Sequence, residues 1–194
     1  MKIKTLALAM TMSITATAQT PKLSKDNIEK VLQAMTLEEK ASLLVGGEYD
    51  FWSTTAMAGN SSHTVPGAAG STIAIPRLGI PETILTDGPA GVRINPTRPE
   101  TNKTFYATGF PVGSCIAATW NTELAFKVGK AIGSEVKAYN CDVILGPGMN
   151  IHRNPLCGRN FEYYSEDPLL TGKIASGYVK GVQNEGAGVS IKHF

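Results

Sequence analysis

The sequence predicts an α/β protein built on a parallel β-sheet. Three short apolar segments with the composition of strands alternate with two longer amphipathic segments with the periodicity of helices. The order strand, helix, strand, helix, strand is that of consecutive βαβ units. Each predicted strand ends at glycine, proline or charged residues. Loops at the carboxyl ends of parallel strands carry binding sites in such folds, so function is expected there.

The predicted strands are short and end abruptly. They are expected at Glu82–Thr86, Cys141–Leu145 and Gly188–Lys192. The first stops at Asp87-Gly88-Pro89 and the second at Gly146-Pro147-Gly148, both of which favour turns.

The predicted helices between these strands carry recognisable start signals. Asn121 can cap a helix from Thr122 to about Asn140, with an apolar residue at every fourth position: Leu124, Val128, Ile132 and Val136. A second helix is expected from Leu169 to about Gln183, with Pro168 suited to its first turn and the acidic Glu166 and Asp167 suited to its cap.

Two further helices are predicted before the first strand. Apolar residues at helical spacing indicate a helix over Asp26–Met35. Thr36 and Glu39 form a capping box for a second helix that runs to about Val45. Residues 49–75 are predicted to be an irregular loop, and loops of that length are usually functional or mobile.

Composition limits the class of protein. The chain has 194 residues, 42% of them hydrophobic and 18% charged, with a net charge of +2. These values suit a globular domain and provide no basic field for nucleic acid. A basic start, an apolar run over Leu6–Ala16 and the small residues Ala16-Thr17-Ala18 predict a secretory signal peptide over residues 1–18, with the mature domain over 19–194. We therefore expect export to the periplasm or the extracellular space, without a membrane span.

Several chemistries have no support in the sequence. The P-loop, the dinucleotide-binding glycine pattern, HExxH and GxSxG are all absent, and we expect neither a metal nor a cofactor. The three cysteines, Cys115, Cys141 and Cys157, are expected to be free, buried or half-buried thiols. His63 and His152 are isolated, and a structural role is expected for both.

Polar residues at the three predicted strand ends form the candidate site. If the strands are neighbours, a carboxylate, two cations and a histidine converge on one rim: Asp87, Arg159, Lys192 and His193. Charged groups strengthen hydrogen bonds to a polyhydroxylated ligand. Structural alternatives remain at this point, since Asp87 could form an Asx turn and Arg159 could pair with Glu162 only to hold a loop.

The strings around these residues resemble the family 3 glycoside hydrolases of the β-glucosidase type. The resemblance rests on Leu85–Arg93, Gly158–Pro168 and Lys192-His193-Phe194, in this order, and on Thr36–Lys40 at the start of the domain. It implies a (β/α)8 TIM-barrel-like N-terminal domain and retaining hydrolysis of terminal β-D-glucosyl bonds in carbohydrate metabolism. Asp87, Arg159, Lys192 and His193 would bind hydroxyls of the non-reducing sugar, and Glu162 would support Arg159.

The resemblance also implies that the catalytic groups lie outside this sequence. A retaining glycosidase needs two carboxyl groups about 5–5.5 Å apart. In this family the nucleophile and the acid/base are expected downstream of Phe194. A full barrel takes about 250 residues, and only about three βα units can be counted here. We therefore expect a truncated, inactive fragment of a β-linked oligosaccharide or glucoside hydrolase. The alternatives are a non-catalytic sugar-binding module and a generic α/β domain.

Overall fold

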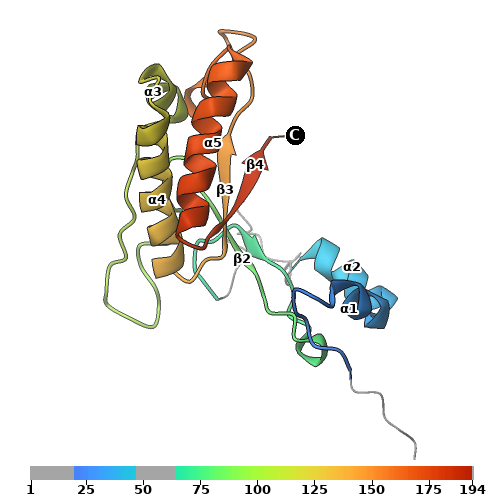
Figure 1. Ribbon diagram of the computed structural model, residues 1–194. Helices are drawn as coiled ribbons and strands as arrows, with labels where there is room; N and C mark the ends of the chain where they lie inside the picture. The colour runs from blue at the N-terminus through green and yellow to red at the C-terminus, as the bar shows by residue number, and fades with distance from the viewer. Residues whose placement is uncertain (1–19, 47–63, 194) are drawn as a thin grey trace, which may run out of the picture.

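The structure is a computed structural model that describes residues 20–46 and 64–193, and it has the predicted α/β architecture. Its sheet has four strands in the order β1-β2-β3-β4. The three parallel strands are β2 (Ile84–Asp87), β3 (Val143–Gly148) and β4 (Gly188–Lys192). Two long helices, α4 (Thr122–Ala138) and α5 (Pro168–Asn184), connect them and lie side by side along one face of the sheet (Figure 1).

The amino ends of the parallel strands are aligned through Asp142. Its carboxylate accepts a 2.8 Å hydrogen bond from the Ile84 N–H, and its own N–H donates to the Ile84 carbonyl at 2.9 Å. Its carbonyl accepts from the Gly188 N–H at 2.7 Å. One residue therefore ties the first residues of all three parallel strands together.

The first strand lies within the segment that was predicted to be irregular. β1 (Gly70–Ser71) pairs antiparallel with β2, and that part of the prediction was wrong. Two residues are too few for an alternating pattern, and the pairing is made by backbone groups, including Ala69 N–H to the Leu85 carbonyl at 2.8 Å. The second predicted strand is also displaced, since it begins at Val143 and continues through Gly148 rather than ending at Leu145.

The caps of both long helices are confirmed. The Asn121 side chain accepts from the Leu124 N–H, and the Asp167 side chain accepts from the N–H groups of Leu169 and Leu170. The predicted apolar stripe of α4 is only partly right. Ile132 and Val136 are buried but Leu124 is exposed, and the rest of the buried face consists of small residues: Ala125, Gly129 and Gly133.

Glycines on both helices allow α4 and α5 to pack closely. A β-carbon at Gly129 would lie 2.2 Å from the carbonyl oxygen of Tyr178 in α5, and one at Gly181 would lie 2.1 Å from the carbonyl oxygen of Phe126. The backbones of α4 and α5 therefore touch directly, which any side chain at these positions would prevent.

The main core lies between the sheet and this helix pair. It combines strand residues such as Ile84 and Ile144 with Ile132, Tyr178 and Val182 from the helices. A second cluster joins the short helix α3 (Gly113–Ala118) to the other end of α4 and α5 through Ile116, Ala125, Tyr164 and Ile174.

The N-terminal helices form a small unit of their own. α1 (Ile28–Ala34) and α2 (Leu37–Val45) pack with the short 3-10 helix η1 (Pro76–Leu78) around Val31, Met35, Ile75 and Leu78. The capping box between Thr36 and Glu39 is present as predicted. Arg77 of η1 donates to the Glu39 carboxylate and to the Ala34 carbonyl, so η1 is tied to both helices.

The thiols depart in part from expectation. All three are free, and Cys141 is buried as predicted, but Cys115 and Cys157 are exposed because they lie on α3 and on the loop after β3 rather than in the core. The predicted signal peptide and His63 lie outside the described residues. No helix among residues 20–46 and 64–193 combines the length and the hydrophobicity that membrane crossing demands.

Candidate functional site

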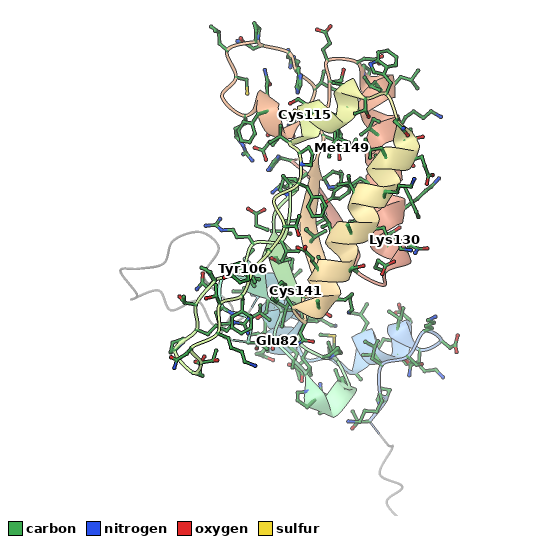
Figure 2. The ribbon with its side chains drawn as sticks, turned by 90° about the vertical axis from the view of Figure 1, so that its left-hand side faces the viewer. Glu82, Tyr106, Cys115, Lys130, Cys141 and Met149 are labelled. Atoms are coloured by element: carbon green, nitrogen blue, oxygen red, sulfur yellow. The ribbon has the colours of Figure 1, made fainter. Side chains whose placement is uncertain are left out.

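The candidate residues lie where the three parallel strands end. Figure 2 shows Cys115 of α3 and Met149, which directly follows β3, toward one end of the molecule. Glu82 and Cys141, which precede β2 and β3, lie toward the other end. Asp87 ends β2 and Lys192 ends β4, so both belong to the Met149 end of the sheet.

Asp87 and Lys192 meet across β3. The Lys192 ammonium donates a 2.7 Å hydrogen bond to Asp87 Oδ1. In the sheet Asp87 is level with Leu145 and Lys192 is level with Gly148, so the long lysine side chain reaches back to the carboxylate. The pair is half-buried, with exposed side-chain fractions of 18% for Lys192 and 33% for Asp87. The ammonium and the carboxylate therefore hold each other in position and remain accessible to a ligand.

The loop after β2 is closed by its own backbone. The Arg93 N–H donates to the Asp87 carbonyl at 3.0 Å, and the buried Thr86 hydroxyl donates to the Arg93 carbonyl at 2.8 Å. Gly88 has a φ of +128°, and a β-carbon there would lie 1.6 Å from the Gly91 carbonyl oxygen. The closed loop brings Arg93 Nη1 to 4.0 Å from Asp87 Oδ2, so Asp87 has a cation near each carboxylate oxygen.

Arg159 and Glu162 come from the loop between β3 and α5. Arg159 precedes the 3-10 helix η2 (Asn160–Glu162), whose turn brings the Glu162 carboxylate onto Arg159 Nε. Glu162 is mostly covered and Arg159 is half exposed. The predicted supporting contact is therefore present, and it occupies Nε and leaves the outer nitrogens of the guanidinium for other partners.

His193 connects this loop to the end of β4. Arg159 Nη2 lies 2.9 Å from His193 Nε2, and the Tyr163 hydroxyl lies 3.2 Å from His193 Nδ1. Asn150, just after β3, brackets the histidine backbone: Oδ1 accepts from the His193 N–H at 2.9 Å and Nδ2 donates to its carbonyl at 3.4 Å. The Lys192–His193 peptide bond is cis.

The electrostatics of the site favour a charged arginine and a neutral histidine. The Glu162 carboxylate raises the pKa of the Arg159 guanidinium above its usual value, and the charge of Asp87 adds to this effect. Burial lowers the pKa of His193, and the positive charges of Arg159 and Lys192 lower it further, against smaller opposing effects of Glu162 and Asp87. Since Asp87 influences both Arg159 and His193, and Lys192 influences His193, the four predicted residues share one electrostatic environment.

A hollow lies beside these charged groups. It has a volume of about 280 Å³ and is lined by the loop Gly88–Gly91, by Val112 and Gly113 at the start of α3, and by Phe161 and Glu162. Within residues 20–46 and 64–193 no three His, Cys, Asp or Glu side chains are grouped as metal ligands. The charged donors and acceptors beside the hollow can form strong hydrogen bonds to the hydroxyl groups of a ligand.

The structure thus brings together all the predicted residues: Asp87 with Lys192, and Arg159 with Glu162 and His193. The sequence analysis missed Arg93, Asn150 and Tyr163 as contributors. Arg93 and Tyr163 stand within the strings that carry the resemblance, and Asn150 follows the second predicted strand, so their positions were a signal. His152 holds the loop after β3 through its backbone, whose N–H donates to the Ser165 carbonyl at 3.1 Å.

Comparison with known proteins gives consistent results. The family described as "Glycosyl hydrolase family 3 N terminal domain" matches this chain over residues 72–194. The thermostable beta-glucosidase B of Acetivibrio thermocellus is 44% identical over 171 residues, which cover 87% of this chain and 20% of that protein. An exo-alpha-(1->6)-L-arabinopyranosidase of Bifidobacterium longum is 43% identical over 164 residues, covering 82% of this chain and 19% of that protein.

Solved structures agree in fold as well as in sequence. The beta-glucosidase 3B of Thermotoga neapolitana, solved in complex with alpha-D-glucose, is 54% identical and superposes with a TM-score of 0.76. The match covers 86% of this chain and 22% of that one. This chain therefore spans about a fifth of the length of the relatives that it matches.

Proposed function

Because this chain belongs to glycosyl hydrolase family 3, we propose that it is the N-terminal part of an exported enzyme that hydrolyses terminal β-D-glucosyl bonds. The observation that carries the proposal is the convergence of Asp87, Lys192, Arg159 and His193 at one end of the sheet. A rim with one carboxylate, two cations and a histidine offers fixed donors and acceptors to the hydroxyls of a single sugar. The glucose complex of the Thermotoga relative supports the choice of sugar.

The fold that best accounts for this rim is a (β/α)8 barrel. The parallel strands follow one another in chain order, and both connecting helices lie on the same face of the sheet, which is the arrangement of consecutive barrel units (Figure 1). In such a barrel further strands would follow β4, and the loops after them would add residues to the same rim.

Catalysis in this proposal uses groups beyond Phe194. In the candidate site the Asp87 carboxylate pairs with Lys192, and the Glu162 carboxylate pairs with Arg159. Both carboxylates therefore orient positively charged side chains that position sugar hydroxyls. We propose a retaining mechanism in which a nucleophilic carboxylate and an acid/base carboxyl, about 5–5.5 Å apart, come from later parts of the polypeptide. The residues described here would bind and orient the sugar to be released, and no cofactor would be required.

The test is an assay of the complete polypeptide that carries this sequence. We expect release of p-nitrophenol from its β-D-glucopyranoside, and ¹H NMR should detect β-glucose before mutarotation. Initial formation of the α-anomer would contradict the retaining mechanism. Faster release of p-nitrophenol from its α-L-arabinopyranoside would indicate the activity for which the Bifidobacterium relative is named.

A variant assay would assign the sugar-binding role. Asp87→Asn should raise KM and lower kcat/KM by about 10- to 150-fold, since a charged hydrogen bond contributes about 1.5–3 kcal/mol and the charge that pairs with Lys192 is lost as well. Asp26→Asn, an exposed carboxylate before α1, is the matched control and should match the wild type. Glucose binding without any hydrolysis would favour the alternative of a non-catalytic sugar-binding module.

Export is proposed on the sequence of residues 1–18 alone. N-terminal sequencing of the protein recovered from outside the cytoplasm should give Gln19 as the first residue. Retention in the cytoplasm with Met1 intact would contradict this part of the proposal.

A further inference from the structure

The exposed side chain of His193 lies near three polar partners whose donor and acceptor roles can be worked out. The Arg159 guanidinium approaches Nε2 at 2.9 Å. An arginine side chain carries five N–H donors and accepts no hydrogen bond. The Nε2 atom must therefore accept, and it cannot carry a proton while this contact exists.

Asn150 gives an independent constraint on the other ring nitrogen. The His193 main-chain N–H can only donate, so the Asn150 atom 2.9 Å from it must be the oxygen, which fixes the orientation of the amide. The same oxygen lies 3.4 Å from Nδ1, and the Tyr163 hydroxyl oxygen lies 3.2 Å from it. The amide oxygen can only accept and the Tyr163 hydroxyl is able to accept, so both groups near Nδ1 suit an Nδ1–H. The ring of the buried Tyr163 stands edge-on to the imidazole ring.

We propose that His193 is held as the neutral imidazole with its proton on Nδ1. In this arrangement Tyr163 and Asn150 are positioning residues, because they accept the Nδ1–H and leave Nε2 as the acceptor for Arg159. The guanidinium is then held at Nε by Glu162 and at Nη2 by His193. His193 thus presents Nε2 as an acceptor only, to Arg159 and to any sugar hydroxyl that reaches it, because an Nε2 atom without a proton has no N–H to donate.

The charges around the ring agree with a neutral histidine. Arg159 and Lys192 face it with positive charge and disfavour the imidazolium, while Glu162 and Asp87 oppose them more weakly. Burial and these cations lower the pKa of His193 below its ordinary 6.5. A second proton, on Nε2, would direct an N–H against the guanidinium N–H and displace Arg159. The affinity for sugar should therefore fall on the acid side of this pKa.

The first test reads the tautomer directly. The complete polypeptide is labelled with ring-¹⁵N histidine, and the His193 signals are assigned from their loss in His193→Gln. At neutral pH and without sugar, Nε2 should be the unprotonated, pyridine-like nitrogen and Nδ1 the protonated, pyrrole-like one. A protonated Nε2, or a doubly protonated ring, would overturn the proposal. This readout needs no hydrolysis, so it stands or falls apart from the proposed function, on which only the link to sugar binding rests.

The second test removes the acceptor on Nδ1. Tyr163→Phe keeps the ring packing and should give a mixture of tautomers, with glucose binding weakened about 2- to 10-fold, the range expected for one hydrogen bond. Tyr164→Phe is the matched control, because Tyr164 is equally buried but packs in the cluster with Ile116 and Ile174. It should leave the tautomer and the affinity unchanged. An unaltered tautomer in Tyr163→Phe would refute the positioning role of Tyr163, and the same measurement on Asn150→Leu tests the second acceptor.

Discussion

Lys192 and Asp87 stand 105 residues apart in the sequence, and the Lys192 ammonium donates a 2.7 Å hydrogen bond to Asp87 Oδ1 across β3. This bond couples the ends of β2 and β4, which have no backbone contact with each other because β3 lies between them. It therefore serves two purposes: it holds the sheet end together, and it orients the carboxylate and the ammonium toward the rim.

Lys192→Met should weaken both properties. Hydrogen bonds to charged groups contribute about 1.5–3 kcal/mol, but Asp87 is one-third exposed, so we expect a loss of about 1 kcal/mol in the free energy of unfolding. Glucose affinity should fall more steeply, since the ammonium is lost and the carboxylate is left without its orienting partner. Urea denaturation and titration calorimetry with glucose would measure the two effects.

A surface pair provides the control for this prediction. Lys130 of α4 lies 3.7 Å from Glu185 at an exposed position. Lys130→Met should change the free energy of unfolding by less than about 0.5 kcal/mol and leave glucose affinity unchanged. Equal losses of affinity in both lysine variants would show that the effect of Lys192 is not local.

Glu162→Gln should loosen Arg159 without unfolding the protein. The glutamine keeps the size of the side chain but replaces a charged acceptor with a neutral one, which roughly halves the strength of the contact with Nε. We expect KM to rise several-fold with little change in the unfolding midpoint. Glu166→Gln changes an exposed carboxylate in the same loop and should leave KM unchanged. A large drop in the unfolding midpoint for Glu162→Gln would mean that the pair holds the loop rather than the arginine.

The parallel strands, the long helices and their caps could be predicted from the sequence because each has a local cause. Asn121 and Asp167 cap their helices with their own side chains, so the signal and the structure lie within a few residues of each other. The strand Gly70–Ser71 could not be predicted, because its pairing with Ile84 and Leu85 depends on backbone groups brought together by tertiary structure.

The candidate site likewise contains residues that could be predicted from the sequence and contacts that could not. Asp87 and Lys192 could be predicted because residues at the ends of parallel strands share one edge, whatever the details of packing. The contacts of Asn150 and Tyr163 with His193 depend on how the loop after β3 folds back onto the end of β4. That path is set by the 3-10 turn at Asn160–Glu162 and by packing against α3, neither of which has a periodic signal.

Two glycines of α5, Gly181 against α4 and Gly172 away from it, should respond in opposite ways to substitution by alanine. Gly181→Ala places a methyl group 2.1 Å from the Phe126 carbonyl oxygen, which only movement of a helix can relieve, so we expect a loss of about 1–3 kcal/mol. Gly172→Ala, in the same helix, meets no atom within 4 Å and should stabilise the protein by about 0.5–1 kcal/mol through helix propensity. Thermal and urea unfolding would measure both, and a stabilising Gly181→Ala would contradict direct backbone contact.

The Arg77–Glu39 pair predicts how stability responds to acid. The Arg77 guanidinium, together with the Thr36 N–H, lowers the pKa of the Glu39 carboxyl below its ordinary 4.5. The unfolded chain then binds a proton more readily than the folded one, so the contribution of Glu39 is complete above pH 4.5 and is lost as the pH falls through the lower, folded value.

Arg77→Met should therefore flatten the acid limb of the stability curve. Arg77 also donates to the Ala34 carbonyl, and that loss is independent of pH. The difference in unfolding midpoint between wild type and variant should be constant at neutral pH and should shrink as the pH falls well below 4.5, where Glu39 is protonated in both proteins. Arg153→Met, at an exposed position after β3, should show no pH-dependent difference. A difference for Arg77→Met that persists unchanged into strong acid would mean that the carbonyl contact, rather than the ion pair with Glu39, ties η1 to the N-terminal helices.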